Sequence, residues 1–87
     1  MNGYAPTARI SPHAHERMEE MHVSSKRVKR LVRDFDLRRC SYAGRWVVTR
    51  EDEPDICVVY VDDEDGTPLV VTVLVRSYAP YVRGECT

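Results

Sequence analysis

The sequence predicts an α+β domain in which two N-terminal helices pack on a three- to four-stranded antiparallel sheet. Apolar residues recur every three to four positions over residues 11–33, which is typical of amphipathic helices. From residue 38 onward, runs of β-branched and aromatic residues alternate with turn residues, which indicates strands. Helices that precede such hairpins pack on one sheet face and leave the other partly open. The 87 residues suffice for a single domain, residues 1–87.

The first predicted helix begins after Ser11 and runs to about His22. Ser11 is a good N-cap, and Pro12 suits the first helical position because its missing N–H has no helical partner there. One stripe of this helix is apolar and is expected to face the core. The stripe consists of Ala14, Met18 and Met21.

His13 and Arg17 border that stripe one helical turn apart, with Glu20 close by. His13 lies in the first turn, where the helix dipole disfavours positive charge. A neutral imidazole beside a guanidinium is a candidate acid/base pair. In the alternative interpretation, His13 packs at the helix start and Arg17 covers apolar surface with its aliphatic stem. On helix geometry alone, this alternative is the better one.

The second predicted helix begins at the cap residue Ser24. Val23 before the cap and Val28 in the helix form a hydrophobic staple. Its basic face is either a surface that follows a phosphate backbone or an ordinary solvated face. Within this second helix no acidic residue occurs until Asp34, which favours an anionic or acidic partner. The apolar positions are Val28, Leu31, Val32 and Phe35, and the basic ones are Lys26, Arg27, Lys29, Arg30 and Arg33.

Four strands are predicted after Asp36, with hairpin turns between them. In the last strand, strict alternation places Val71 and Val73 on one face and Val70 and Thr72 on the other. The dipeptides Ala43-Gly44 and Asp65-Gly66 indicate turns. The predicted strands are residues 38–42, 45–50, 56–61 and 69–75.

The two ends of the chain show no periodic pattern, so residues 1–10 are expected to form a loose lead-in and residues 77–87 a tail. No secretory signal is recognisable, and no apolar run approaches the ~18 residues of a membrane span. We therefore expect no membrane partner and a cytoplasmic location. The net charge of −1 gives no general indication of nucleic-acid binding.

Two patterns resemble parts of metal sites. The acidic run 62–65 is too short for a calcium loop and lacks the closing glutamate, so a solvated hairpin tip is expected there. His15, Glu19 and His22 share one helix face and suit zinc or iron, but without a fourth ligand nearby a solvated face is the better interpretation. The three cysteines lack metal-site spacing, and Cys57 is expected in the core. We predict no metal and no cofactor.

The motif Ser11-x-His13-Ala14-x-x-Arg17-Met18, followed by Val23-Ser24 and later by Val70-Val71-Thr72-Val73, resembles a family of small bacterial and phage proteins of unassigned function. The resemblance spans residues 10–76. It departs from the family pattern at Met21, where an arginine is usual. This family has been grouped with barnase, EndoU, colicin-type and RelE-like ribonucleases, which share a helix-then-sheet fold. Many members of that group are toxins of toxin–antitoxin systems.

The resemblance implies a metal-independent endoribonuclease, or an inactive relative of one. In this chemistry a base activates the ribose 2′-OH to attack the adjacent phosphate, and an acid protonates the leaving oxygen. His13 would be the acid or base, Arg17 would bind the phosphate, and Thr72 would contact it from the sheet. The residues expected to bind RNA are Lys26, Arg30, Arg33, Arg76 and Tyr81.

A non-enzymatic function is the alternative. Small phage and mobile-element proteins often act by binding a host protein. The basic second helix, an exposed sheet edge and the tyrosine-containing tail are each suited to such an interface. The partner is thus expected to be RNA, or else a host or antitoxin protein.

Overall fold

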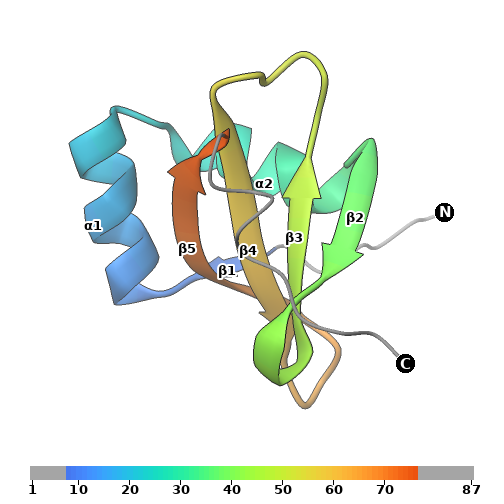
Figure 1. Ribbon diagram of the computed structural model, residues 1–87. Coiled ribbons are helices and arrows are strands. Elements are labelled where there is room, and N and C mark those ends of the chain that lie inside the picture. The colour runs from blue at the N-terminus through green and yellow to red at the C-terminus, as the bar shows by residue number, and fades with distance from the viewer. Residues whose placement is uncertain (1–7, 77–87) are drawn as a thin grey trace, which may run out of the picture.

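A computed structural model describes residues 8–76 and shows an α+β fold with two helices and one five-stranded mixed sheet (Figure 1). The strand order across the sheet is β1-β5-β4-β3-β2. The elements are β1 (Arg9–Ile10), α1 (Pro12–Met21), α2 (Ser25–Arg33), β2 (Leu37–Cys40), the 3-10 turn η1 (Tyr42–Gly44), β3 (Arg45–Thr49), β4 (Ile56–Asp62) and β5 (Pro68–Val75).

The sheet differs from the prediction in strand number and direction. The short strand β1 pairs in parallel with β5, through Arg9 with Leu69 and Ile10 with Val70. These two N-terminal residues belong to the segment predicted to be a loose lead-in, and a two-residue strand is too short to show a period. The other neighbouring strands are antiparallel, as predicted.

The helix ends agree with the predicted signals. The Ser11 hydroxyl accepts a hydrogen bond from the Ala14 N–H at 3.1 Å, and Pro12 is the first helical residue. His22 ends α1 in the left-handed conformation, with φ of 57°. The Ser24 hydroxyl accepts from the Arg27 N–H at 3.3 Å and caps α2. The predicted starts of both helices and the predicted end of α1 are therefore confirmed. α2 ends at Arg33, so Phe35, expected on its apolar face, lies beyond the helix and is exposed.

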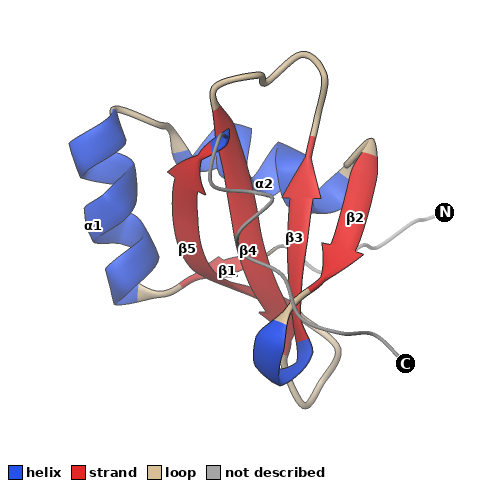
Figure 2. Ribbon diagram, in the orientation of Figure 1, coloured by secondary structure: helices blue, strands red, loops and turns tan. Residues whose placement is uncertain are grey.

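The helices occupy one side of the sheet. α1 lies beside β5, and α2 lies behind the sheet against β3 and β4 (Figure 2). The main core between them includes Val28 and Leu31 of α2 and Val58 of β4, each fully buried. On the opposite face, expected to be partly open, Val47, Cys57 and Val59 form a second buried cluster.

The predicted alternation along β5 is wrong, because the strand contains a bulge. The register with β4 steps between Val59 and Tyr60, so Thr72 lies opposite Val59 and Val70 lies opposite Tyr60. An extra residue in one strand reverses the sheet face to which the side chains after it point. Val70 and Val73 consequently share the helix-side core, although alternation places them on opposite faces.

Candidate functional site

The predicted catalytic helix α1 holds Arg17 against the sheet. The Arg17 Nε donates to the Val73 carbonyl at 3.4 Å, and its Nη1 donates to Glu20 Oε1 at 2.9 Å. The Ser11 N–H donates to the Val70 carbonyl at 3.0 Å, so the N-cap and the middle of α1 are both hydrogen-bonded to β5. Arg17 therefore satisfies a strand carbonyl and an acidic neighbour, and these contacts occupy its guanidinium.

Of the other two predicted catalytic residues, His13 lies on α1, one helical turn from Arg17, and Thr72 lies on β5. His13 is exposed in the first turn of α1. Thr72 lies opposite Val59 in the β4–β5 register, and cross-strand partners share a face, so its side chain belongs to the face away from the helices. The Thr72 hydroxyl is buried there and makes no hydrogen bond with another of the described residues. The Thr72 side chain thus belongs to the sheet face opposite the one on which α1 and α2 pack.

The candidate metal-ligating residues of α1 do not assemble either. Over residues 8–76, no group of three or more His, Cys, Asp or Glu side chains is arranged so that it could hold a metal ion. His22 adopts a left-handed backbone, so helical periodicity no longer sets its direction relative to His15 and Glu19. The three residues line a shallow hollow whose floor includes Met18 and Val23.

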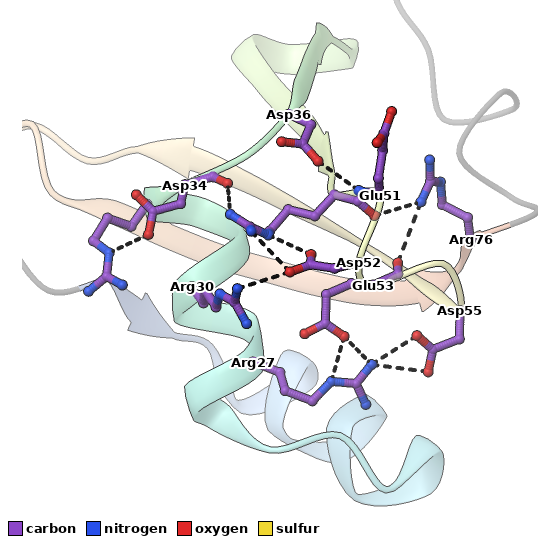
Figure 3. Close-up of polar contacts among 11 residues, drawn as sticks. Arg27, Arg30, Asp34, Asp36, Glu51, Asp52, Glu53, Asp55 and Arg76 are labelled. Atoms are coloured by element: carbon purple, nitrogen blue, oxygen red, sulfur yellow. Dashed lines mark hydrogen bonds and ion pairs between the residues drawn. The ribbon is translucent and has the colours of Figure 1, made fainter.

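The basic helix α2 faces an acidic loop. The β3–β4 connection, residues 50–55, lies beside α2 because the helix packs across both of these strands. Figure 3 shows Arg27 and Arg30 extending from α2 toward the carboxylates of this loop. We call this set of contacts the α2–loop clasp; it contains Arg27, Arg30, Arg50, Asp52, Glu53, Asp55 and Arg76.

Arg27 is the central cation of the clasp. Its Nε and Nη2 donate to one oxygen of Glu53 at 2.8 and 2.5 Å, and Nη2 also donates to Asp55 at 2.8 Å. Glu53 is 7% exposed, so the pair is largely removed from water. The hydrogen bonds that Arg27 donates to Glu53 and then to Asp55 raise the pKa of its guanidinium, and Arg27 in turn lowers the pKa of Asp55.

A second part of the clasp surrounds Asp52. Arg50 donates to both of its oxygens, at 2.8 and 3.1 Å, and Arg30 donates to Asp52 Oδ2 at 2.9 Å. The hydrogen bond from Arg50 is the main cause of the lowered pKa of Asp52. Arg76 Nη1 donates to the carbonyls of Arg50 and Glu53 at 3.1 and 3.4 Å, which ties the end of β5 to the same loop.

These contacts account for most of the residues that were predicted to bind RNA. Arg30 and Arg76 belong to the clasp, and Arg33 donates to its neighbour Asp34 at 2.9 Å. Lys26 is exposed and makes no ion pair with the other described residues. Tyr81 lies outside the described residues. The pairing of residues 26–33 with residues 50–55 was missed, although two neighbouring runs of opposite charge were the signal for it.

A different group of arginines lies at the opposite edge of the sheet, on β2. Arg39 pairs with Val47, and Arg45 lies two residues before Val47 on β3, so the two arginines share a face. Both are exposed, and neither makes an ion pair with the rest of residues 8–76. Leu37, on the same face, is 53% exposed.

Arg38 lies on the other face of β2 and packs on aromatic rings. Its guanidinium carbon lies 4.0 Å from the centre of the Trp46 ring and 5.3 Å from that of Phe35. Its Nη1 donates to the Tyr60 hydroxyl at 3.2 Å. Cation–π contacts of this kind hold an arginine in place without a carboxylate. We call Leu37, Arg38, Arg39 and Arg45 together the β2 edge surface.

The chain matches no protein-family profile, no curated protein and no solved structure. Neither of the two described helices has the length and apolar character that crossing a bilayer requires. The candidate site therefore rests on the geometry of residues 8–76. Within that part of the chain, the β2 edge surface combines cationic side chains without counter-charges and an exposed apolar one.

Proposed function

We propose that this chain is a binding domain that acts through contact with a protein partner, and that the β2 edge surface is its contact site. The observation that carries the proposal is the difference in charge pairing between two arginine groups. Arg27, Arg30 and Arg50 are neutralised within the molecule, whereas Arg39 and Arg45 are exposed and make no ion pair with another residue of 8–76. Unmatched arginines beside an exposed leucine complement an acidic protein surface with an apolar component.

The placement of the predicted catalytic residues favours binding over RNA cleavage. Arg17 is held by Glu20 and a β5 carbonyl, and Thr72 belongs to the far face of the sheet. A phosphate-binding arginine needs donors directed at the phosphate, and those of Arg17 are directed at the protein. Ribonuclease activity stays a prediction of the resemblance, and the binding proposal is designed to be tested against it.

The test measures two activities on the same protein samples. Equilibrium binding is measured with a fluorescein-labelled peptide of alternating glutamate and valine, and cleavage is measured with labelled RNA in chelator. We expect the double variant Arg39→Glu/Arg45→Glu to weaken peptide binding at least tenfold. The matched control is Lys26→Glu, which reverses an exposed charge on α2 that has no ion pair within residues 8–76 and should leave binding unchanged.

The two measurements give opposite results for the two functions. RNA cleavage that disappears in His13→Ala, together with peptide binding that is indifferent to the β2 variants, would overturn the binding proposal and establish the ribonuclease. Peptide binding that depends on Arg39 and Arg45, with intact RNA, would support the proposal.

A further inference from the structure

The outer edge of β2 offers hydrogen-bonding groups as well as charge. In residues 8–76, β2 pairs with β3 alone and stands last in the strand order. The Ser41 N–H donates to the Arg45 carbonyl at 2.7 Å, which marks this as a hydrogen-bonded pair. Along an antiparallel ladder, hydrogen-bonded pairs of residues alternate with pairs that are not hydrogen-bonded. The pair Arg39–Val47 is therefore hydrogen-bonded, and the pair Arg38–Val48 is not. The backbone N–H and C=O of Arg38 therefore point away from the sheet.

Charged residues on an edge strand commonly prevent it from pairing with other strands. That explanation fits a second copy of this chain, because antiparallel pairing of two β2 strands would place arginines opposite arginines. It does not exclude a strand of opposite charge. Arg39 and Arg45 repel a basic strand but attract an acidic one. The exposed Leu37 beside them supplies apolar contact.

We propose that an extended acidic segment of a partner protein adds to β2 as a further strand of the sheet. The backbone of Arg38 exchanges hydrogen bonds with this segment, and acidic side chains at alternate positions face Arg39 and Arg45. The side chains at the intervening positions of the segment lie on the opposite face of the sheet, where Arg38 packs over Trp46. This inference rests on the proposed function and adds the conformation and charge pattern of the bound segment.

The chain contains a natural reporter for this event. Trp46 is its only tryptophan, and the Arg38 guanidinium lies 4.0 Å from the ring centre. A strand that bonds to the Arg38 backbone comes to lie next to this pair. Bound peptide is therefore expected to change the tryptophan emission in proportion to the fraction bound.

The experiment separates strand addition from attraction by charge alone. The first probe is the alternating glutamate–valine heptapeptide, and the second is the same peptide with N-methyl groups on alternate residues, which keep the charge and remove the N–H donors. We expect methylation to weaken binding at least tenfold. Binding is measured by anisotropy of a labelled peptide and, independently, by the Trp46 emission.

A pair of variants makes the same test on the protein side. Arg38→Pro removes the outward N–H, whereas Arg38→Ala removes the side chain and keeps that donor. Proline is tolerated in edge strands at such positions, so the fold should persist, which circular dichroism and the unfolding midpoint verify. We expect Arg38→Pro to bind the parent peptide at least tenfold more weakly than Arg38→Ala.

The outcomes distinguish this inference from the function on which it rests. Equal binding of both peptides, still dependent on Arg39 and Arg45, overturns strand addition and leaves the binding function standing. Binding of neither peptide overturns both. A peptide-free dimer that Arg38→Pro dissociates assigns the edge to a second copy and also overturns the inference.

Discussion

Two arginine-rich regions of this molecule differ in what their charges contact. On α2, Arg27 and Arg30 meet the carboxylates of residues 50–55 at hydrogen-bond distance. On β2 and β3, Arg39 and Arg45 have no such partner among the described residues. Both local sequences are rich in basic residues, so the presence of arginine alone does not distinguish the two regions. The difference teaches that the topology, which brings the β3–β4 loop beside α2, decides which cations remain available to another molecule.

The comparison also separates stability from recognition. The α2–loop clasp joins a helix to a loop and contains a buried carboxylate, so its charges should contribute to the free energy of unfolding. The β2 edge surface is exposed, and charges there contribute little to stability. Substitutions in the two regions should therefore change different measured quantities.

The largest expected effect is that of Glu53→Ala. This change leaves the two-thirds-buried Arg27 side chain without its closest carboxylate and opens a space where Glu53 was 7% exposed. Removing one partner of a partly buried pair should cost about 2 kcal/mol of unfolding free energy. Urea denaturation measures this loss of unfolding free energy. The matched control is Glu51→Ala, because Glu51 lies in the same loop but is exposed, and its unfolding free energy should change by less than about 0.5 kcal/mol. Equal midpoints for the two variants would contradict a structural role for the clasp.

Acid should weaken the clasp over a defined pH range. The pKa values of Asp52 and Asp55 are lowered in the folded protein by hydrogen bonds from Arg50 and Arg27. A carboxylate with a lowered folded pKa binds protons more readily when unfolded, so its contribution is complete above the unfolded value. That contribution is lost as the pH falls below about 4 toward the folded pKa.

The measurement is the unfolding midpoint in urea between pH 6 and pH 2, on the parent protein and on Asp52→Asn/Asp55→Asn. The variant is expected to be less stable than the parent at pH 6 and to approach it as the pH falls. A difference between the two proteins that stays constant with pH would show that these aspartates do not act through their charge.

Local signals predicted a large part of this fold. Ser11 and Ser24 cap helices as expected, because N-capping depends on a few neighbouring residues. Gly66, with φ of 82°, forms the expected hairpin tip between β4 and β5 for the same reason. Features that depend on distant residues were not predicted. The parallel strand at Arg9 needs β5 beside it, and the bulge in β5 appears only in its register with β4.

The candidate site shows the same limit. Helical spacing correctly placed Arg17 beside the apolar stripe of α1, but its contact with the Val73 carbonyl depends on how the helix lies along β5. The acidic loop and the basic helix were each visible in the sequence, and their contact is a property of the packing of α2 on β3 and β4. Residues at the β2 edge carry no motif, so only the sheet order reveals that Arg39 lies at an edge.

The smallest expected effects belong to the β2 edge, where two adjacent arginines serve as each other's control. Arg38→Ala removes the contact with Trp46 and the hydrogen bond to Tyr60, which should cost about 0.5–1 kcal/mol and shift the tryptophan emission. Arg39→Ala removes an exposed side chain that makes no ion pair with the rest of the described part of the chain, so stability should change by less than about 0.5 kcal/mol. Urea unfolding followed at Trp46 measures both. A loss of stability in Arg39→Ala as large as in Arg38→Ala would mean that Arg39 is also needed by the fold, and the contrast between a paired helix and an available edge would then fail.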